Sequence, residues 1–250
     1  MPQIVRRSVS GVALLATLAA CGGTESGASD APTGPSGTGG TTTTAPPARD
    51  TARVVLQNLG LVLAPHDATT RRAGDVDFAR AGPRAFWEFG FRVTTPTGEW
   101  KGLPHYTWLS PPGTPIVSAI DGVVRWARDQ GKGDYEILLA PNARSTWWVS
   151  YDHLVRPRVD SGDVVHVGDT LGFAPGTADV PMVWELMAGD YATDRAFCPH
   201  ALLAPALRAG YADALARLVR EWETFRGDTT LYDESRFVAP GCLVESMPGG

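Results

Sequence analysis

Between residues 103 and 187 the chain consists of short runs of β-branched and aromatic residues, each bounded by turn-forming residues. The runs cover residues 116–120, 122–127, 135–139 and 146–151, and Gly, Asp, Asn and Pro separate them. Residues 131–134 and 141–143 have the composition of hairpin turns. Short strands with turn signals between them are typical of a β-sandwich or barrel. The sequence therefore predicts a mostly β domain in this region.

Four short motifs follow one another along these predicted strands. They are Pro-Gly-Thr-Pro at 112–115, Tyr-Asp-His-Leu at 151–154, Gly-Asp-Val-Val at 162–165 and Gly-Asp-Thr-Leu-Gly at 168–172. In this order they resemble the lysostaphin-type (LytM-like) zinc metallopeptidases, which cut peptidoglycan cross-links. The resemblance implies a two-sheet β domain, built on a duplicated hybrid motif, over residues 103–200.

The zinc-binding residues of that family are mostly missing. A catalytic zinc needs three protein ligands and an open position for water. In the family these ligands are the His of His-x-x-x-Asp, that Asp, and the second His of His-x-His. Carried over by position, His105 is retained, whereas Trp108 stands for the Asp and Val183 for the last His. Because neither Trp nor Val can coordinate zinc, the resemblance implies a degenerate member that binds no zinc and is not a peptidase.

The family's two auxiliary histidines correspond to His153, which is present, and to Pro181. His153 is thus the candidate for acid–base chemistry, and a packed, hydrogen-bonded imidazole is the alternative. Because side chains alternate along a strand, we expect Asp152 to point to the face opposite His153.

A shifted ligand set of His105, His153 and Glu185 would instead make the protein an active, metal-dependent peptidoglycan endopeptidase. Glu185 shares a strand face with Val183 but lies about 6–7 Å further along the strand. That distance argues against a single metal centre.

We expect a ligand-binding cleft formed by His105, Trp108, His153, Trp184 and Glu185. Aromatic faces beside a few polar groups suit sugar rings or peptide stems. The alternative is that the tryptophans only fill the volume left by the metal, since voids destabilise a fold.

Residues 1–20 have the pattern of an export signal. Two arginines at 6 and 7 precede an apolar run at 9–20, which is shorter than the roughly 20 residues that a membrane span requires. Leu-Ala-Ala-Cys at 18–21 resembles a bacterial lipobox, which implies lipidation of Cys21; a plain signal peptide is the alternative. Residues 21–50 are rich in Gly, Thr, Ser and Pro and predict a disordered tether.

The flanks of the β domain differ from it in pattern. Residues 51–102 predict an N-terminal elaboration that packs on the sheet, with one strand over 86–93 and either strands or a short helix over 54–63. Residues 201–250 predict a C-terminal amphipathic helix followed by a tail. Apolar residues recur at helical spacing from Leu203 to Trp222, and Pro205 lies near the start, where proline is tolerated.

With Cys21 assigned to the lipid, Cys198 and Cys242 remain as a pair. An exported chain enters a compartment that permits disulfides, so we expect these two to be bonded and to tether the tail. Two buried free thiols are the alternative.

A formal charge of −5 with no basic run argues against a nucleic-acid partner. We therefore expect a cell-envelope lipoprotein, held at the membrane through Cys21, whose domain binds peptidoglycan or a wall-hydrolase partner. In a host with two membranes we expect the outer one, because Gly22 rather than Asp follows the cysteine. A purely structural lipoprotein with a self-filled cleft is a further alternative.

Overall fold

The structure is a computed structural model that describes residues 48–95 and 97–249. The predicted signal peptide, Cys21 and residues 22–47 of the predicted tether lie outside the described residues. Asp50 forms an isolated β-bridge with Ser145, and its amide donates to the Arg144 carbonyl at 3.0 Å. No helix in the described part of the chain has the length and apolar character needed to cross a membrane.

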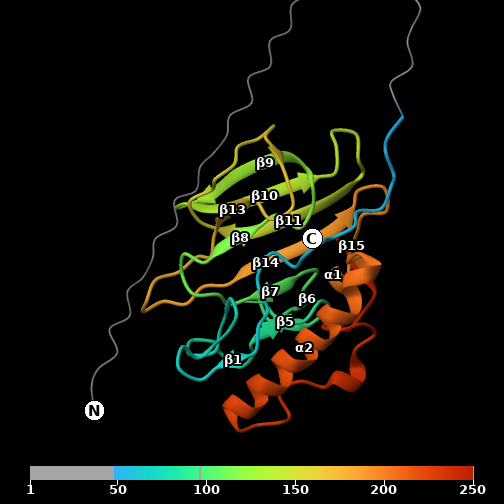
Figure 1. Cartoon of the computed structure of the whole chain (residues 1–250). Coiled ribbons are helices and arrows are strands. Elements are labelled where there is room, and N and C mark those ends of the chain that lie inside the picture. The colour runs from blue at the N-terminus through green and yellow to red at the C-terminus, as the bar shows by residue number, and fades with distance from the viewer. Residues whose placement is uncertain (1–47, 96, 250) are drawn as a thin grey trace, which may run out of the picture. The chain divides into compact units, whose positions relative to one another are not determined.

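One large antiparallel sheet organises the fold (Figure 1). Its strands lie in the order β12-β9-β10-β11-β14-β15-β16, and β7 pairs with β14 and with β4. The bounds are β4 (Phe86–Trp87), β7 (Tyr106–Trp108), β9 (Gly122–Gly131), β10 (Asp134–Ala140), β11 (Trp147–Leu154), β12 (Val164–Val165), β14 (Trp184–Asp190), β15 (Arg195–Phe197) and β16 (Ser246–Pro248). The predicted mostly β class is confirmed.

The predicted turn between β9 and β10 is present. Lys132 and Gly133 both have positive φ angles, 62° and 79°, as the tight turns that suit a right-twisted hairpin require. On the core side of this hairpin and its neighbours, Ile137, Leu139 and Val149 are fully buried. The hairpin therefore fixes the register of β9 against β10.

Three smaller sheets complete the β structure. They are β1 (His66–Asp67), β2 (Arg72–Ala73) and β3 (Val76–Asp77); β5 (Arg92–Thr94) with β6 (Trp100–Gly102); and β8 (Pro115–Val117) with β13 (Thr170–Phe173). The single strand predicted over 86–93 was wrong. It divides into β4 and β5 because Gly90 adopts a φ of 83°, a conformation that ends an extended strand.

The predicted C-terminal amphipathic helix is confirmed as α2 (Pro205–Arg226), preceded by the short α1 (Pro199–Leu202). Pro205 occupies the first turn, where its missing N–H costs nothing. Gly227 ends the helix in the left-handed conformation. The buried face packs on the N-terminal elaboration, where the rings of Trp222 and Phe78 lie 5.1 Å apart.

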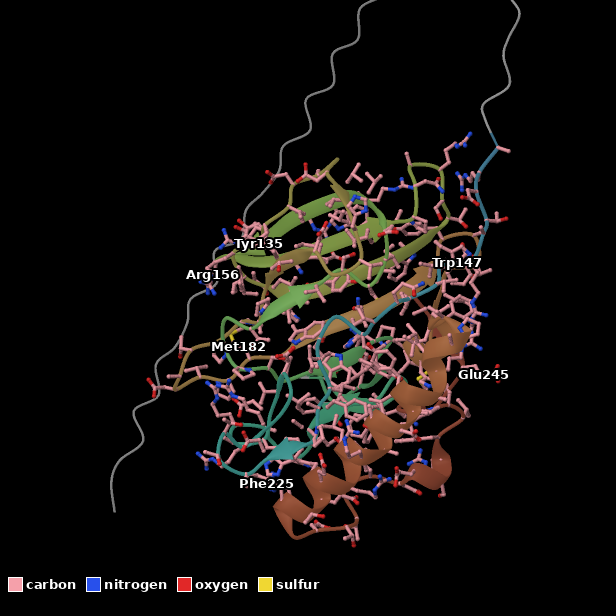
Figure 2. All side chains as sticks on the ribbon, in the orientation of Figure 1. Tyr135, Trp147, Arg156, Met182, Phe225 and Glu245 are labelled. Carbon is pink, nitrogen blue, oxygen red and sulfur yellow. A yellow bond between two sulfur atoms is a disulfide. The ribbon has the colours of Figure 1, made fainter. Side chains whose placement is uncertain are left out.

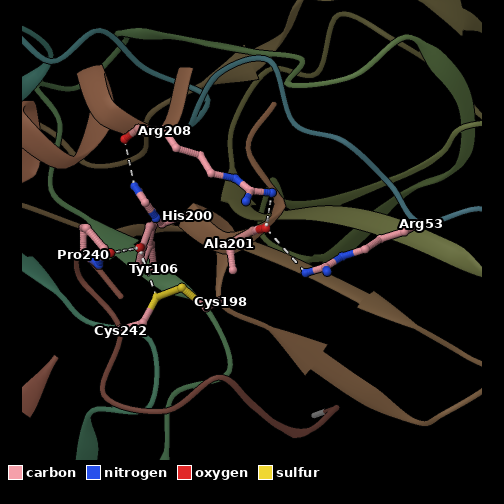
Figure 3. Close-up of a disulfide and its surroundings, with 8 residues drawn as sticks. All are labelled: Arg53, Tyr106, Cys198, His200, Ala201, Arg208, Pro240 and Cys242. Atoms are coloured by element: carbon pink, nitrogen blue, oxygen red, sulfur yellow. Dashed lines mark hydrogen bonds between the residues drawn. A yellow bond between two sulfur atoms is a disulfide. The ribbon is translucent and has the colours of Figure 1, made fainter. Parts of the chain in front are cut away.

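Cys198 and Cys242 form the predicted disulfide (Figure 3). Both cysteines are fully buried. The Tyr106 hydroxyl donates to the Pro240 carbonyl at 2.6 Å and lies 3.2 Å from the Cys242 sulfur. The tail is thereby fixed against β7 and continues into β16, the last strand of the large sheet.

Candidate functional site

The site is centred on His105, which immediately precedes β7 and whose side chain is only 6% exposed. Its Nε2 lies 3.2 Å from Oε2 of Glu185 on β14. Its Nδ1 shares a hydrogen bond of 2.9 Å with the Thr107 hydroxyl. Both ring nitrogens thus have a protein partner, and the imidazole is held in one orientation.

Glu185 lies in the middle of a row of polar residues that crosses three adjacent strands. The register pairs Glu185 with Thr107 on β7 and with Asp152 on β11. Residues directly opposite each other in an antiparallel pair share a face and are close neighbours. Two carboxyl groups therefore stand next to each other beside His105.

A β-bulge adds His153 and Asp134 to this row. Tyr135 pairs with Leu154 and Ile137 with Tyr151, so Asp152 and His153 together oppose a single residue of β10. His153 has a φ of 60°, which breaks the alternation of the strand. As a result, donor atoms of Asp134, Asp152 and His153 all lie within 4.8 Å of one another.

The expected orientation of Asp152, on the face opposite His153, was therefore wrong. Side chains alternate between faces only in a regular strand, and the bulge interrupts this alternation at Asp152 and His153. The Nδ1–H of His153 donates to the Asp134 carboxylate at 3.0 Å. The backbone amide of His153 donates to the Asp152 carboxylate at 2.8 Å.

Burial sets the charge of the central pair. It lowers the pKa of His105 from 6.5 to about 3, with the positive charges of Lys101 and His153 adding to the effect. It raises the pKa of Glu185 from 4.5 to about 7, and the neighbouring carboxylate of Asp152 adds to this. At neutral pH, His105 is thus a neutral imidazole beside a carboxyl group that is only partly ionised.

The pKa of His153 shifts in the opposite direction to that of His105. Partial burial on its own lowers the pKa of His153, but the hydrogen bond to Asp134 and the charges of Asp152 and Glu185 outweigh it, so the pKa is raised. Burial raises the pKa of Asp152 as well. The cluster can hold and exchange protons near neutral pH, and its carboxylates can bind a cationic group.

Two of the predicted cleft residues are core residues instead. Trp108 and Trp184 have no exposed surface. The Trp108 indole stacks on Phe86, with ring centroids 5.0 Å apart, and the Trp184 indole N–H donates to the Ser110 hydroxyl at 3.0 Å. The structure therefore brings together His105, His153 and Glu185, with both tryptophans packed behind them.

Strand alternation explains the error over Trp108. His105 and Thr107 are hydrogen-bonded on one face, so Trp108 points to the other. Counting His-x-x-x-Asp from His105 also ends at Leu109, one residue beyond Trp108. Leu109 is buried and has no atom that could coordinate a metal.

The residues at the family's zinc position do not fit zinc. His105 has one other donor beside it, Glu185, whereas a catalytic zinc takes three protein ligands. Among the described residues, the sole trio of His, Cys, Asp or Glu with donor atoms this close together is Asp134, Asp152 and His153. The predicted alternative set of His105, His153 and Glu185 is not brought within that distance.

Sequence reasoning missed three polar members of the site: Thr107, Asp134 and Asp152. Thr107 could have been found, because a residue two positions after His105 on a predicted strand shares its face. Asp134 begins β10, and only the hairpin register places it next to His153. Nothing in the sequence alone marks the bulge.

No protein-family model matches the sequence, and no curated protein matches it. Similar solved structures include the catalytic domain of lysostaphin from Staphylococcus simulans, at 20% identity over 46% of this chain and 87% of that one, with a TM-score of 0.36. A variant of the catalytic domain of EnpA, a prophage-encoded M23 protein from Enterococcus faecalis, matches at 21% identity over 45% and 87%, with a TM-score of 0.33.

A third similar structure is Csd3 from Helicobacter pylori, at 14% identity over 76% of this chain and 47% of that one, with a TM-score of 0.39. The chain spans 42% of the lysostaphin structure determined in solution.

Proposed function

We propose that this protein is a cell-envelope lipoprotein whose LytM-like domain binds peptidoglycan and does not cleave it. The domain keeps the order of the family's strand and turn motifs but would hold no zinc at the family position. Its remaining polar cluster would bind the peptide part of the wall, whose free amino groups suit the carboxylates of Asp134, Asp152 and Glu185.

A single observation carries this proposal. The retained residue, His105, is buried; its Nδ1 is hydrogen-bonded to Thr107 and its Nε2 lies 3.2 Å from Glu185. The positions that would complete a zinc site hold Leu109 and Val183. One nitrogen of this imidazole is bonded to Thr107 and the other faces Glu185, whereas a catalytic zinc would need two further protein ligands beside it. The site is thus arranged for binding rather than for activating water.

The proposed location follows from the sequence. The lipobox-like ending at 18–21 would attach the protein to a membrane through Cys21, and the tether would let the domain reach the wall. Replacing Cys21 by Ala should move the protein from the membrane fraction to the soluble envelope fraction. Unchanged membrane association of this variant would contradict the lipid anchor.

Three measurements on the purified protein test the proposed activity. Zinc content after chelator washing should be far below one ion per chain. Cross-linked muropeptides should remain uncleaved with or without added zinc. Purified peptidoglycan sacculi should retain the protein in a pull-down.

Two matched double variants test whether the polar cluster is the binding surface. D134N/D152N should lose retention on sacculi, whereas D213N/D228N, which removes two exposed carboxylates elsewhere, should keep it. Equal retention of both variants would refute the proposed site. Cleavage that depends on stoichiometric zinc would refute the proposed function, and retention only in the presence of a wall hydrolase would assign the surface to that partner instead.

A further inference from the structure

A second polar hollow lies at the other end of β11, away from the candidate site. It has a volume of about 410 Å³ and is lined by Arg49, Arg125, Ala143, Arg144, Ser145, Thr146 and Tyr191. Three of these residues are arginines and none is acidic. This is unusual for a chain whose net charge is −5.

The hollow is built by contacts between distant segments. The amide of Asp50 donates to the Arg144 carbonyl at 3.0 Å, and the amide of Thr146 donates to the Asp50 carbonyl at 2.8 Å. These bonds hold Arg49 next to the loop that carries Arg144. The amide of Tyr191 donates to the Thr146 carbonyl at 3.0 Å, which fixes the opposite wall.

Arg125 is oriented by a β-bulge. Leu138 pairs with Trp126 and Leu139 with Val124, so Arg125 is the extra residue of β9. Bulges of this kind redirect a side chain. The Arg125 guanidinium donates to the carbonyls of Asn142 and Ser145 at 3.2 and 3.1 Å, and its other donors remain available.

The arginines of the hollow have no ion-pair partner in the part of the chain that the structure describes. Among the described residues, none of the three forms an ion pair within 4.0 Å. The pKa of Asp50 is lowered by hydrogen bonds from the Ala52 amide at 2.9 Å and from Asn142 at 2.6 Å, and to a smaller extent by the charge of Arg144. The oxygens of the Asp50 carboxylate are thus occupied by hydrogen bonds within the protein.

A buried hydroxyl in the lining also lacks a partner. The Thr146 Oγ1 atom is buried and makes no hydrogen bond among the described residues. Leaving such a group unpaired destabilises a fold. Because this atom is buried, it is out of reach of a ligand in the open hollow and takes no part in the proposed site.

We propose that this hollow is a binding site for a phosphate group, held by the guanidiniums of Arg49, Arg125 and Arg144. Arginine presents a fork of N–H donors that matches phosphate oxygens. Thr146 and His153 are seven residues apart on one extended segment, so the two sites are separated by about 23 Å at about 3.3 Å per residue. Figure 2 shows this separation through Trp147 at one end of β11 and Arg156 beyond the other.

The test uses the full chain and two probes. Calorimetric titration with inorganic phosphate measures binding of the soluble anion. Co-sedimentation with phosphatidylcholine vesicles, with or without phosphatidylglycerol, measures binding to a lipid headgroup. R125Q/R144Q is compared with R71Q/R72Q, which removes two exposed arginines elsewhere; residues 1–47 are the same in both variants, so their contribution to vesicle binding cancels.

R125Q/R144Q should weaken binding at least about tenfold, the factor that corresponds to one charge-assisted hydrogen bond, and R71Q/R72Q should not. Loss in the phosphate titration alone identifies a soluble phosphate as the ligand, and loss in the vesicle assay alone identifies a lipid headgroup. Circular dichroism verifies that each variant is folded, and R144K, which keeps the charge, should recover part of the affinity. Binding that is absent for both probes, or equal in the two double variants, overturns the proposal.

Discussion

Replacing Glu185 by Gln should remove a pH-dependent loss of stability. The Glu185 side chain is 21% exposed. Burial, reinforced by the charge of Asp152, raises the pKa of Glu185 from 4.5 to about 7. The folded state therefore holds this proton more tightly than the unfolded state does. The corresponding stability is fully present below pH 4.5 and is lost as the pH rises through about 7.

The size of the loss follows from the two pKa values. At about 1.4 kcal/mol per pH unit, the interval between 4.5 and about 7 corresponds to at most about 3.5 kcal/mol of unfolding free energy. The amide introduced by E185Q would keep a hydrogen-bonding group beside His105 without a charge. We expect E185Q to exceed the wild type by less than about 1 kcal/mol near pH 5 and by a margin that grows toward pH 8.

Urea unfolding followed by tryptophan fluorescence, at pH values from 5 to 8, measures this difference. E99Q, at an exposed glutamate, is the matched control and should follow the wild type. E185Q also removes the Glu185 charge that helps to raise the pKa of His153, so the difference reports Glu185 together with its coupling to His153. A wild-type stability that rises with pH relative to E185Q would show that the carboxylate is stabilised in the folded state and that the reasoning is wrong.

Three further changes have effects that can be read from the structure. W108A should destabilise the fold by about 3–5 kcal/mol, because it deletes a fully buried indole; a loss below about 1 kcal/mol in urea unfolding would mean that the ring is poorly packed. C198S/C242S should lose about 3–4 kcal/mol, as expected for opening a loop with a sequence separation of 44, and an unchanged melting temperature would contradict this. T146V should raise the unfolding free energy by about 1 kcal/mol in phosphate-free buffer, because it removes a buried, unpaired hydroxyl; a lowered melting temperature would show that the hydroxyl has a partner.

The regular parts of the fold were predictable from the sequence. The hairpin turn at Lys132 and Gly133, the strands beside it and the helix that begins at Pro205 all follow from local patterns. The strand predicted over 86–93 failed because a single glycine conformation, at Gly90, interrupts an otherwise favourable run. Glycine is compatible with both extended and left-handed backbone, so its presence in a sequence does not decide between them.

The site was predicted in part. His105, His153 and Glu185 lie on strands whose order the motifs imply, and the structure places all three in one cluster. The predicted roles of Trp108 and Trp184 were wrong. Successive residues of a strand point to opposite faces, and both tryptophans point into the core rather than into the cleft. The bulge at Asp152 could not be predicted, since it depends on the register of a partner strand.

The disulfide has a consequence for producing this protein. The Cys198–Cys242 bond holds the segment that supplies β16, and β16 covers the outer edge of β15. An uncovered strand edge is a template for pairing with another molecule. Material expressed in a reducing cytosol should therefore self-associate, whereas the same chain secreted into an oxidising medium should elute as a monodisperse species.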